Sequence, residues 1–163
     1  MRDNEWLKKR LDHIWRTYFA NVAQANEVTI EFGRAARTRL GSIKQLRLMR
    51  RGAVDALNTS GSLITITGYF KDERVPEFMI DAVIAHELCH YAHGFSSPLP
   101  QLLKYPHQGG AVDREMIKRG LGDMLLAQQK WLKTEWKDVV GPIRRRTVRK
   151  RKKMSLFQFL ING

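Results

Sequence analysis

The chain begins with an amphipathic pattern in which apolar residues recur at steps of three and four. This spacing places them on one face of an α-helix. Asp3 or Asn4 suits the N-cap, because a short polar side chain can accept a hydrogen bond from the first helical N–H groups. We therefore predict a core-packing helix, whose apolar face comprises Trp6, Leu7, Leu11, Ile14, Trp15, Tyr18, Phe19 and Val22.

Three short stretches that follow have the composition of β-strands. Residues 28–32 alternate between apolar and polar positions, and residues 63–67 are rich in β-branched side chains. Residues 43–49 follow Leu40-Gly41-Ser42 and predict a further strand, while residues 52–61 carry turn-forming residues. We expect these strands to form a small, mostly antiparallel sheet ahead of the next helix.

Residues 76–94 form the most apolar helical segment of the chain. Pro76 suits the first helical position, and Gly94 can end the helix in a left-handed conformation. A helix that is apolar on most sides is expected in the interior of a protein. Its apolar residues are Phe78, Met79, Ile80, Val83, Ile84 and Leu88.

The helical periodicity stops after Gly94 and resumes at Ala111. Residues 95–110 contain three prolines and a Gly-Gly pair, so we predict a long loop, and closing a functional site would explain its length. A helix is expected over residues 111–126, weakened by Gly120 and Gly122, with residues 131–136 extending it or beginning another. The elements together predict an α+β fold: an N-terminal helix, a small sheet, the apolar helix and a following C-terminal helix.

The apolar helix carries the segment His86-Glu87-Leu88-Cys89-His90. Histidines four residues apart lie on one face of a helix, where both imidazoles can hold the same metal ion. Glu87 lies beside that face, where it can reach a water molecule on the metal without becoming a ligand. This His-Glu-x-x-His pattern is typical of zinc peptidases, and the structural alternative is a helix whose polar stripe faces solvent.

A catalytic zinc ion usually takes three protein ligands, so the sequence must supply one more. The candidates are His93, His107, Asp113 and Glu115. His93 lies about two helical turns from His86, roughly 10 Å along the axis, which is too far for one tetrahedral site. We favour His107, which the long loop can bring to the metal, and keep the acidic residues as alternatives, Glu115 in particular.

The composition adds a strong positive charge. The chain has 163 residues and a net charge of +13, with 29 lysines and arginines against 16 acidic residues. Such an excess favours polyanionic partners, DNA or RNA. Eight of the ten residues 144–153 are basic, and we expect this cluster to contact phosphates; it consists of Arg144, Arg145, Arg146, Arg149, Lys150, Arg151, Lys152 and Lys153.

Length and composition also predict the domain organisation of the protein and its cellular compartment. The length suits one domain over residues 1–140, followed by a basic tail over residues 141–163 that ends in a short apolar segment. A single cysteine excludes an internal disulfide and fits a reducing cytoplasm, and a protein linked to DNA would lie at the nucleoid or in the nucleus. No signal peptide or membrane-spanning stretch is expected, so a membrane is not predicted as a partner.

The motifs resemble those of the SprT-like zinc metallopeptidases, which include the Spartan proteases, and of the related minigluzincins. The likeness covers roughly residues 27–122 and consists of Leu40-Gly41-Ser42 ahead of a β-branched strand, the His86–His90 segment, and His107 before a helix. Two features depart from the family: Gln108 separates His107 from the following glycine, and the single cysteine excludes the family's C-terminal zinc ribbon.

The resemblance implies a zincin-like fold, one zinc ion per chain and an endopeptidase that acts on proteins associated with DNA, such as DNA–protein crosslinks. It also implies that the strand at residues 63–67 is a sheet edge that binds an extended substrate. The residues themselves predict peptide hydrolysis with Glu87 as general base. Two alternatives stay open: a general cytoplasmic zinc peptidase without a link to DNA, and a nucleic-acid-binding module with a structural metal.

Overall fold

The computed structural model of the chain describes residues 1–46 and 61–142, and its fold class is α+β as predicted. The first helix, α1 (Asn4–Tyr18), begins at Asp3, whose side chain accepts a hydrogen bond from the Trp6 N–H at 2.8 Å. Its buried residues Leu7, Leu11 and Ile14 belong to the predicted apolar face. The prediction of this helix from its periodicity is therefore confirmed.

The sheet contains three described strands in the order β1-β3-β2: β1 (Val28–Phe32), β2 (Gly41–Gln45) and β3 (Ser62–Ile66). β2 pairs with β3 in antiparallel fashion, whereas β1 pairs with β3 in parallel. The prediction of a mostly antiparallel sheet is thus wrong for one of the two pairings. The third strand, β3, is the central one, so the predicted substrate-binding edge at residues 63–67 is wrong too; the edge strands of the described sheet are β1 and β2.

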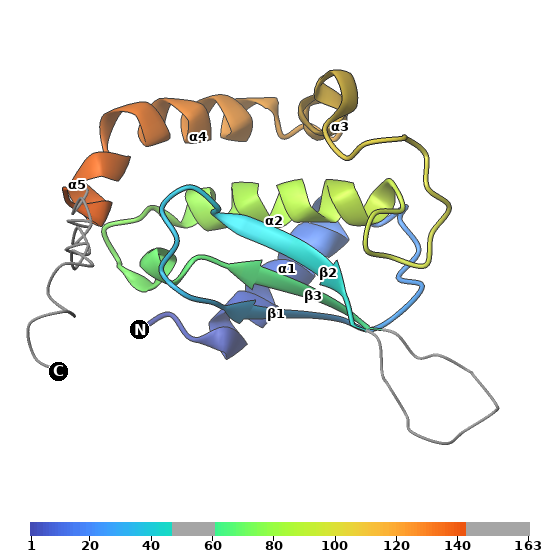
Figure 1. The fold of residues 1–163 in the computed structure, drawn as a ribbon, viewed down its shortest axis with the longest axis horizontal. Coiled ribbons are helices and arrows are strands. Elements are labelled where there is room, and N and C mark those ends of the chain that lie inside the picture. The colour runs from blue at the N-terminus through green and yellow to red at the C-terminus, as the bar shows by residue number, and fades with distance from the viewer. Residues whose placement is uncertain (47–60, 143–163) are drawn as a thin grey trace, which may run out of the picture.

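One face of the sheet packs against helices (Figure 1). Alternate residues of β1 and β3 are buried, and they join the core cluster together with α1 and α2 (Glu77–Ala92). The buried strand residues are Val28, Ile30, Ile64 and Ile66. Arg10 of α1 forms an ion pair with the buried Asp81 of α2 and fixes the two helices together.

Helix α2 is buried along most of its length because its sequence is apolar on almost every side. Pro76 is its N-cap, one position ahead of the predicted one, and Gly94 follows its end with a φ angle of 80°. A Cβ atom at Gly94 would lie 2.4 Å from the carbonyl oxygen of Pro100. Gly94 therefore allows both the sharp turn and the close return of the following loop.

The predicted helix over residues 111–126 is two helices. α3 (Ala111–Lys118) ends before Gly120, which has a φ angle of 80°, and α4 (Gly122–Thr134) begins two residues later. Glycine readily adopts this left-handed conformation, so the chain turns here instead of continuing the helix. α5 (Trp136–Val140) then follows, and α4 lies alongside α2 in the fold (Figure 1).

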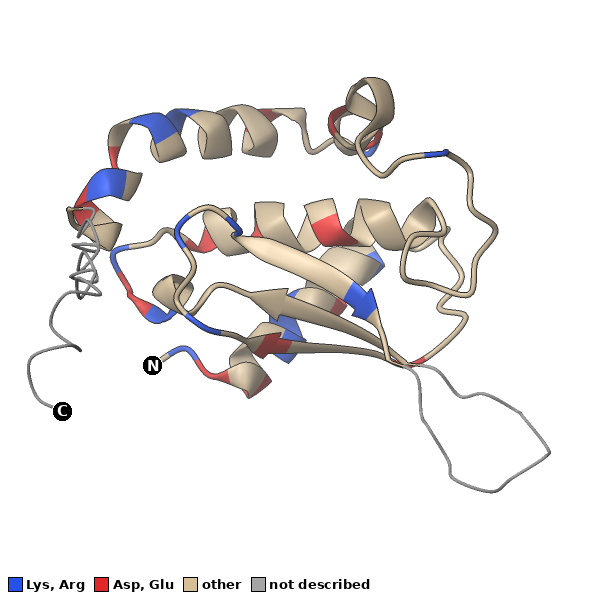
Figure 2. Cartoon of the chain, viewed as in Figure 1, with Lys and Arg blue, Asp and Glu red and all other residues tan. Residues whose placement is uncertain are grey.

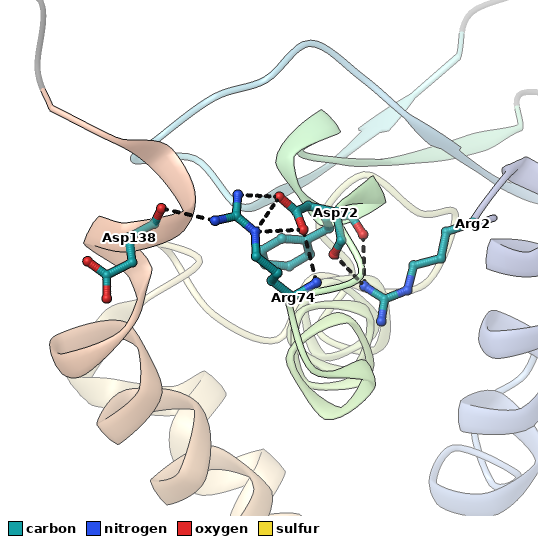
Figure 3. A network of polar contacts seen from close by, with 5 residues as sticks. Arg2, Asp72, Arg74 and Asp138 are labelled. Atoms are coloured by element: carbon teal, nitrogen blue, oxygen red, sulfur yellow. Dashed lines mark hydrogen bonds and ion pairs between the residues drawn. The ribbon is translucent and has the colours of Figure 1, made fainter.

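A polar network holds the end of α5 to the start of the chain (Figure 3). Arg74 pairs with Asp72 at 2.6 Å and reaches the Asp138 carbonyl oxygen at 3.5 Å. Arg2 donates to the carbonyl oxygens of Phe70 and Asp72. These contacts join α5 to the turn before α2 and to the N-terminal end of the chain.

Several sequence predictions fall outside the described residues. They are the end of the strand predicted at 43–49, the loop at 52–60, and the tail from residue 143 onward with its basic cluster and apolar end. β2 begins at Gly41, two residues earlier than predicted. Within residues 1–46 and 61–142, no helix combines the length and apolar character that crossing a bilayer requires.

Candidate metal centre

Three histidines from two parts of the chain meet at one point. The Nε2 atoms of His86 and His90 lie 3.2 Å apart, and the ring centroid of His107 lies 5.3 Å from that of His86 and 4.7 Å from that of His90. One ligand atom from each residue falls within 4.8 Å of the other two. The three residues therefore lie close enough to bind a metal ion together.

The spacing of the first two histidines fits a tetrahedral zinc ion. Zinc–nitrogen bonds of about 2.0–2.1 Å at a tetrahedral angle separate two ligand nitrogens by about 3.3 Å. The observed 3.2 Å between the two Nε2 atoms agrees with this value. Among the described residues, no other group of three or more histidine, cysteine or carboxylate side chains gathers in this way.

The protonation state of the histidines also suits a metal. Burial, followed by the neighbouring His107, lowers the pKa of His86 to about 4. Burial, followed by His86, lowers the pKa of His90 to about 4 as well. Both imidazoles are thus neutral at pH 7, which is the form that donates a lone pair to a metal.

Secondary structure explains how each ligand reaches the site. His86 and His90 are one turn apart on α2, which is buried along most of its length. His107 is exposed and comes from the loop that follows α2, just before the short 3-10 helix η2 (Gln108–Gly110). That loop is tied back to α2 by a hydrogen bond from the Leu102 N–H to the His93 carbonyl oxygen at 3.0 Å.

Glu87 lies beside the histidines and outside the ligand group. It is buried, and burial raises the pKa of its carboxyl to about 7, an effect that a hydrogen bond from the Ile43 backbone N–H partly offsets. A carboxyl with a pKa near the working pH can both take and return a proton. The general-base role of Glu87 stays a prediction, and the described group of possible metal ligands does not include Glu87.

Gly41 allows β2 to lie directly on this glutamate. A Cβ atom at Gly41 would lie 2.5 Å from Cγ1 of Val83 and 2.7 Å from Oε1 of Glu87. Real Cβ atoms do not approach other atoms so closely, so any side chain here would displace the carboxylate or the strand. The Leu40-Gly41-Ser42 segment therefore has a structural role in the site.

The histidines open into a cleft of about 650 Å³ between β2 and α4. Ser42 and Ile43 of the edge strand line one side, and Gln128 and Leu132 of α4 line another. Ser96, which lies on the loop after α2, and both α4 residues were not predicted from the sequence. No local pattern marks them, because the packing of α4 beside α2 is what brings them to the cleft.

Two of the other candidate ligands, His93 and Glu115, are engaged elsewhere. His93 lies 3.9 Å from the carboxylate of Glu115, which in turn pairs with Arg119 at 2.7 Å. Arg119 also donates to the Tyr18 carbonyl oxygen at 2.7 Å and so joins α3 to the end of α1. Neither Glu115 nor Asp113 belongs to the metal group. The structure thus favours His107 over the acidic alternatives.

The predicted nucleic-acid-binding cluster cannot be placed, since residues 144–153 lie outside the described part of the chain. Most of the excess positive charge lies in residues 47–60 and 143–163. In the described part, basic and acidic positions occur together on the helices other than α2, which carries acidic positions only, and basic positions also mark the β1–β2 connection and the end of β2 (Figure 2). Residues 1–46 and 61–142 together carry 18 lysines and arginines against 15 acidic residues, so they contribute little of the excess positive charge.

Comparisons with known proteins add no assignment to this site. Neither protein-family models, nor curated proteins, nor solved structures give a match to the chain. The interpretation of the site therefore rests on the geometry of His86, His90, His107 and Glu87.

Proposed function

We propose that this protein is a zinc-dependent endopeptidase with His86, His90 and His107 as metal ligands and Glu87 as general base. The observation that carries the proposal is the 3.2 Å separation of the two Nε2 atoms, with His107 beside them and the buried Glu87 outside the ligand group. Three protein ligands leave a fourth coordination position for water, which is the arrangement of a catalytic zinc site.

When bound, zinc supplies a Lewis acid that lowers the pKa of a water molecule toward 7. Glu87 would accept a proton from the attacking water, whose oxygen would form the new bond to the peptide carbonyl carbon. As the carbon–nitrogen bond breaks, Glu87 returns that proton to the leaving amine. The burial of Glu87 and its hydrogen bond from the Ile43 N–H hold the carboxylate in one orientation for both transfers.

The cleft supports a substrate with an extended backbone. It runs along β2, an edge strand of the described sheet, beside the histidines. An extended peptide can add to such an edge through main-chain hydrogen bonds, which places few demands on its sequence. We infer that the substrates are unfolded or flexible protein segments.

Sequence motifs and charge indicate the family of the enzyme and the setting of its substrates. The Leu40-Gly41-Ser42 segment, the His-Glu-x-x-His segment and the later histidine resemble the sequence motifs of SprT-like peptidases, and the basic cluster 144–153 suits phosphate contacts. We propose that the enzyme acts on proteins attached to DNA or RNA. A structural metal would call for four protein ligands, and the described group has three, which favours the enzyme over a binding module.

The test is cleavage of a denatured, fluorescently labelled protein by the zinc-loaded chain. We expect Glu87→Gln to keep one zinc ion per chain and to lose cleavage, because it removes the base without removing a ligand. Glu77→Gln on the same helix is the matched control and should cleave like the wild type, since Glu77 is exposed in the first turn. Cleavage by Glu87→Gln at the wild-type rate would contradict the proposal.

A further inference from the structure

The register of the sheet determines which backbone groups of β2 are free to bind a peptide. The Thr67 N–H donates to the Leu40 carbonyl oxygen at 2.9 Å, and the Leu46 N–H donates to the Gly61 carbonyl oxygen at 2.7 Å. In an antiparallel pair, residues that bond to the partner strand alternate with residues that point away from it. Gly41 and Ile43 therefore direct their N–H and C=O groups toward the free edge.

Both edge groups of Ile43 already have partners within the chain. Its N–H donates to the carboxylate of Glu87, and its carbonyl oxygen accepts a hydrogen bond from Oγ of Ser96 at 3.2 Å. The Ser96 hydroxyl thus lies at the acceptor that the N–H of an added strand would use. By contrast, none of the described side-chain hydrogen bonds involves the N–H or the carbonyl oxygen of Gly41.

The backbone of Ser96 adopts a strained conformation, which its neighbours hold in place. Its φ angle is 56°, and it is the only non-glycine residue in the described part of the chain with a positive φ. The Ser96 carbonyl oxygen accepts a hydrogen bond at 2.7 Å from Oγ of the buried Ser62, which also receives one from Asn26 at 3.0 Å. Backbone strain of this kind persists where the surroundings enforce it, and it concentrates at functional sites.

We propose that Ser96 is a specificity-determining residue that sets the register and length of the bound peptide on β2. The substrate pairs with the edge strand at Gly41 and leaves it before Ile43, because the Ser96 hydroxyl holds the next acceptor. This inference rests on the proposed peptidase function and deepens it. The preferred substrates are then protein segments that pair with β2 over only a short stretch, such as loops and frayed ends. Long extended strands are bound less well.

Ser96→Ala tests the inference because it removes only the hydroxyl. The freed Ile43 carbonyl can then accept an additional main-chain hydrogen bond, so KM for a long unfolded peptide should fall about threefold to tenfold at unchanged kcat. Ser96→Gly also frees the carbonyl, and glycine tolerates the observed φ, so it serves if the alanine variant folds poorly. The control is Ser97→Ala, which removes a hydrogen bond to the Tyr91 carbonyl oxygen and should leave KM unchanged.

A second readout identifies the hydrogen bond itself. Peptides that are N-methylated at one position at a time lack one backbone N–H each, and in the Ser96 variants an additional position should become sensitive to methylation. An unchanged KM together with an unchanged methylation profile in both variants would overturn the inference. If the wild-type protein with zinc cleaves none of the peptides, the proposed function itself fails, so the two failures are distinguishable.

Discussion

A Cβ atom on Gly41 would lie 2.7 Å from Oε1 of Glu87, so the edge strand and the proposed general base are in direct contact. The two residues come from elements that are far apart in the sequence, β2 and α2. The absence of a side chain at position 41 is what lets the carboxylate lie under the strand. The orientation of the base therefore depends on a residue that carries no chemistry of its own.

This contact predicts that Gly41→Ala impairs cleavage while zinc stays bound. The added methyl group must displace Glu87, Val83 or β2, and a misplaced base should lower kcat by about 100-fold, the usual contribution of general base catalysis. Steady-state kinetics with metal analysis checks the prediction. Gly122→Ala is the control, because its Cβ would meet only Cγ1 of Ile117 at an ordinary 3.7 Å. Wild-type kcat in Gly41→Ala would count against this role of Gly41.

The third ligand can be separated from Glu115 by measuring zinc affinity. We expect His107→Ala to weaken zinc binding by more than about 100-fold, since even residues that only support ligands contribute 10- to 100-fold. Glu115→Gln should keep the zinc, because that carboxylate pairs with Arg119 and lies outside the histidine group. Competition with a chromophoric chelator measures both values. Zinc loss in Glu115→Gln, with retention in His107→Ala, would reverse the assignment.

The partly buried ion pair between Arg119 and Glu115 predicts a loss of stability when the arginine is removed. The side chains of Arg119 and Glu115 are 10% and 18% exposed, and Arg119 also bonds to the Tyr18 carbonyl oxygen. Arg119→Ala removes the guanidinium group that pairs with the Glu115 carboxylate and should lower the free energy of unfolding by about 3 kcal/mol. Urea denaturation of the zinc-free protein measures this change. A change below about 1 kcal/mol would show that solvent replaces the arginine.

Cys89 should report on folding through its thiol. Burial raises the pKa of this thiol to about 12, from an ordinary value of 9.0, so the folded protein keeps it protonated at pH 8. Because the folded pKa lies above the unfolded one, this group costs stability as the pH rises above about 9 and has no effect at lower pH. We expect slow alkylation by iodoacetamide at pH 8 in native protein and fast alkylation in urea. Equal rates would contradict the burial of Cys89.

The basic cluster 144–153 gives a prediction for DNA binding. Lysines and arginines without interleaved aromatic residues contact phosphates, and each such contact releases counterions. Replacing the eight basic residues by serine should weaken binding to all DNA sequences alike and flatten its dependence on salt. Fluorescence anisotropy at several salt concentrations provides the measurement. An unchanged affinity for DNA would show that the basic cluster does not bind nucleic acid.

The sequence predicted those features that local patterns encode. The period of α1, the alternation in β1 and the His86–His90 spacing follow directly from backbone geometry, and all three are present in the structure. The position of His107 beside them was also expected, since the loop after Gly94 is long enough to return to α2.

Other features depend on contacts between distant segments. The parallel pairing of β1 with β3 and the edge position of β2 are settled by tertiary packing, so the sequence favoured the wrong edge. Gly120 weakened the predicted helix, but only the structure shows that it separates α3 from α4. The positive φ of Ser96 has no local signal, because serine rarely adopts this conformation without enforcement by its surroundings.

The most direct test of the central claim is a crystal structure of the zinc-loaded protein with anomalous diffraction at the zinc edge. We predict one zinc ion per chain, bound by Nε2 of His86, Nε2 of His90 and a ring nitrogen of His107, with solvent at the fourth position. Glu87 should face that solvent without binding the metal. Zinc held by four protein ligands, or by Glu115 in place of His107, would contradict the account.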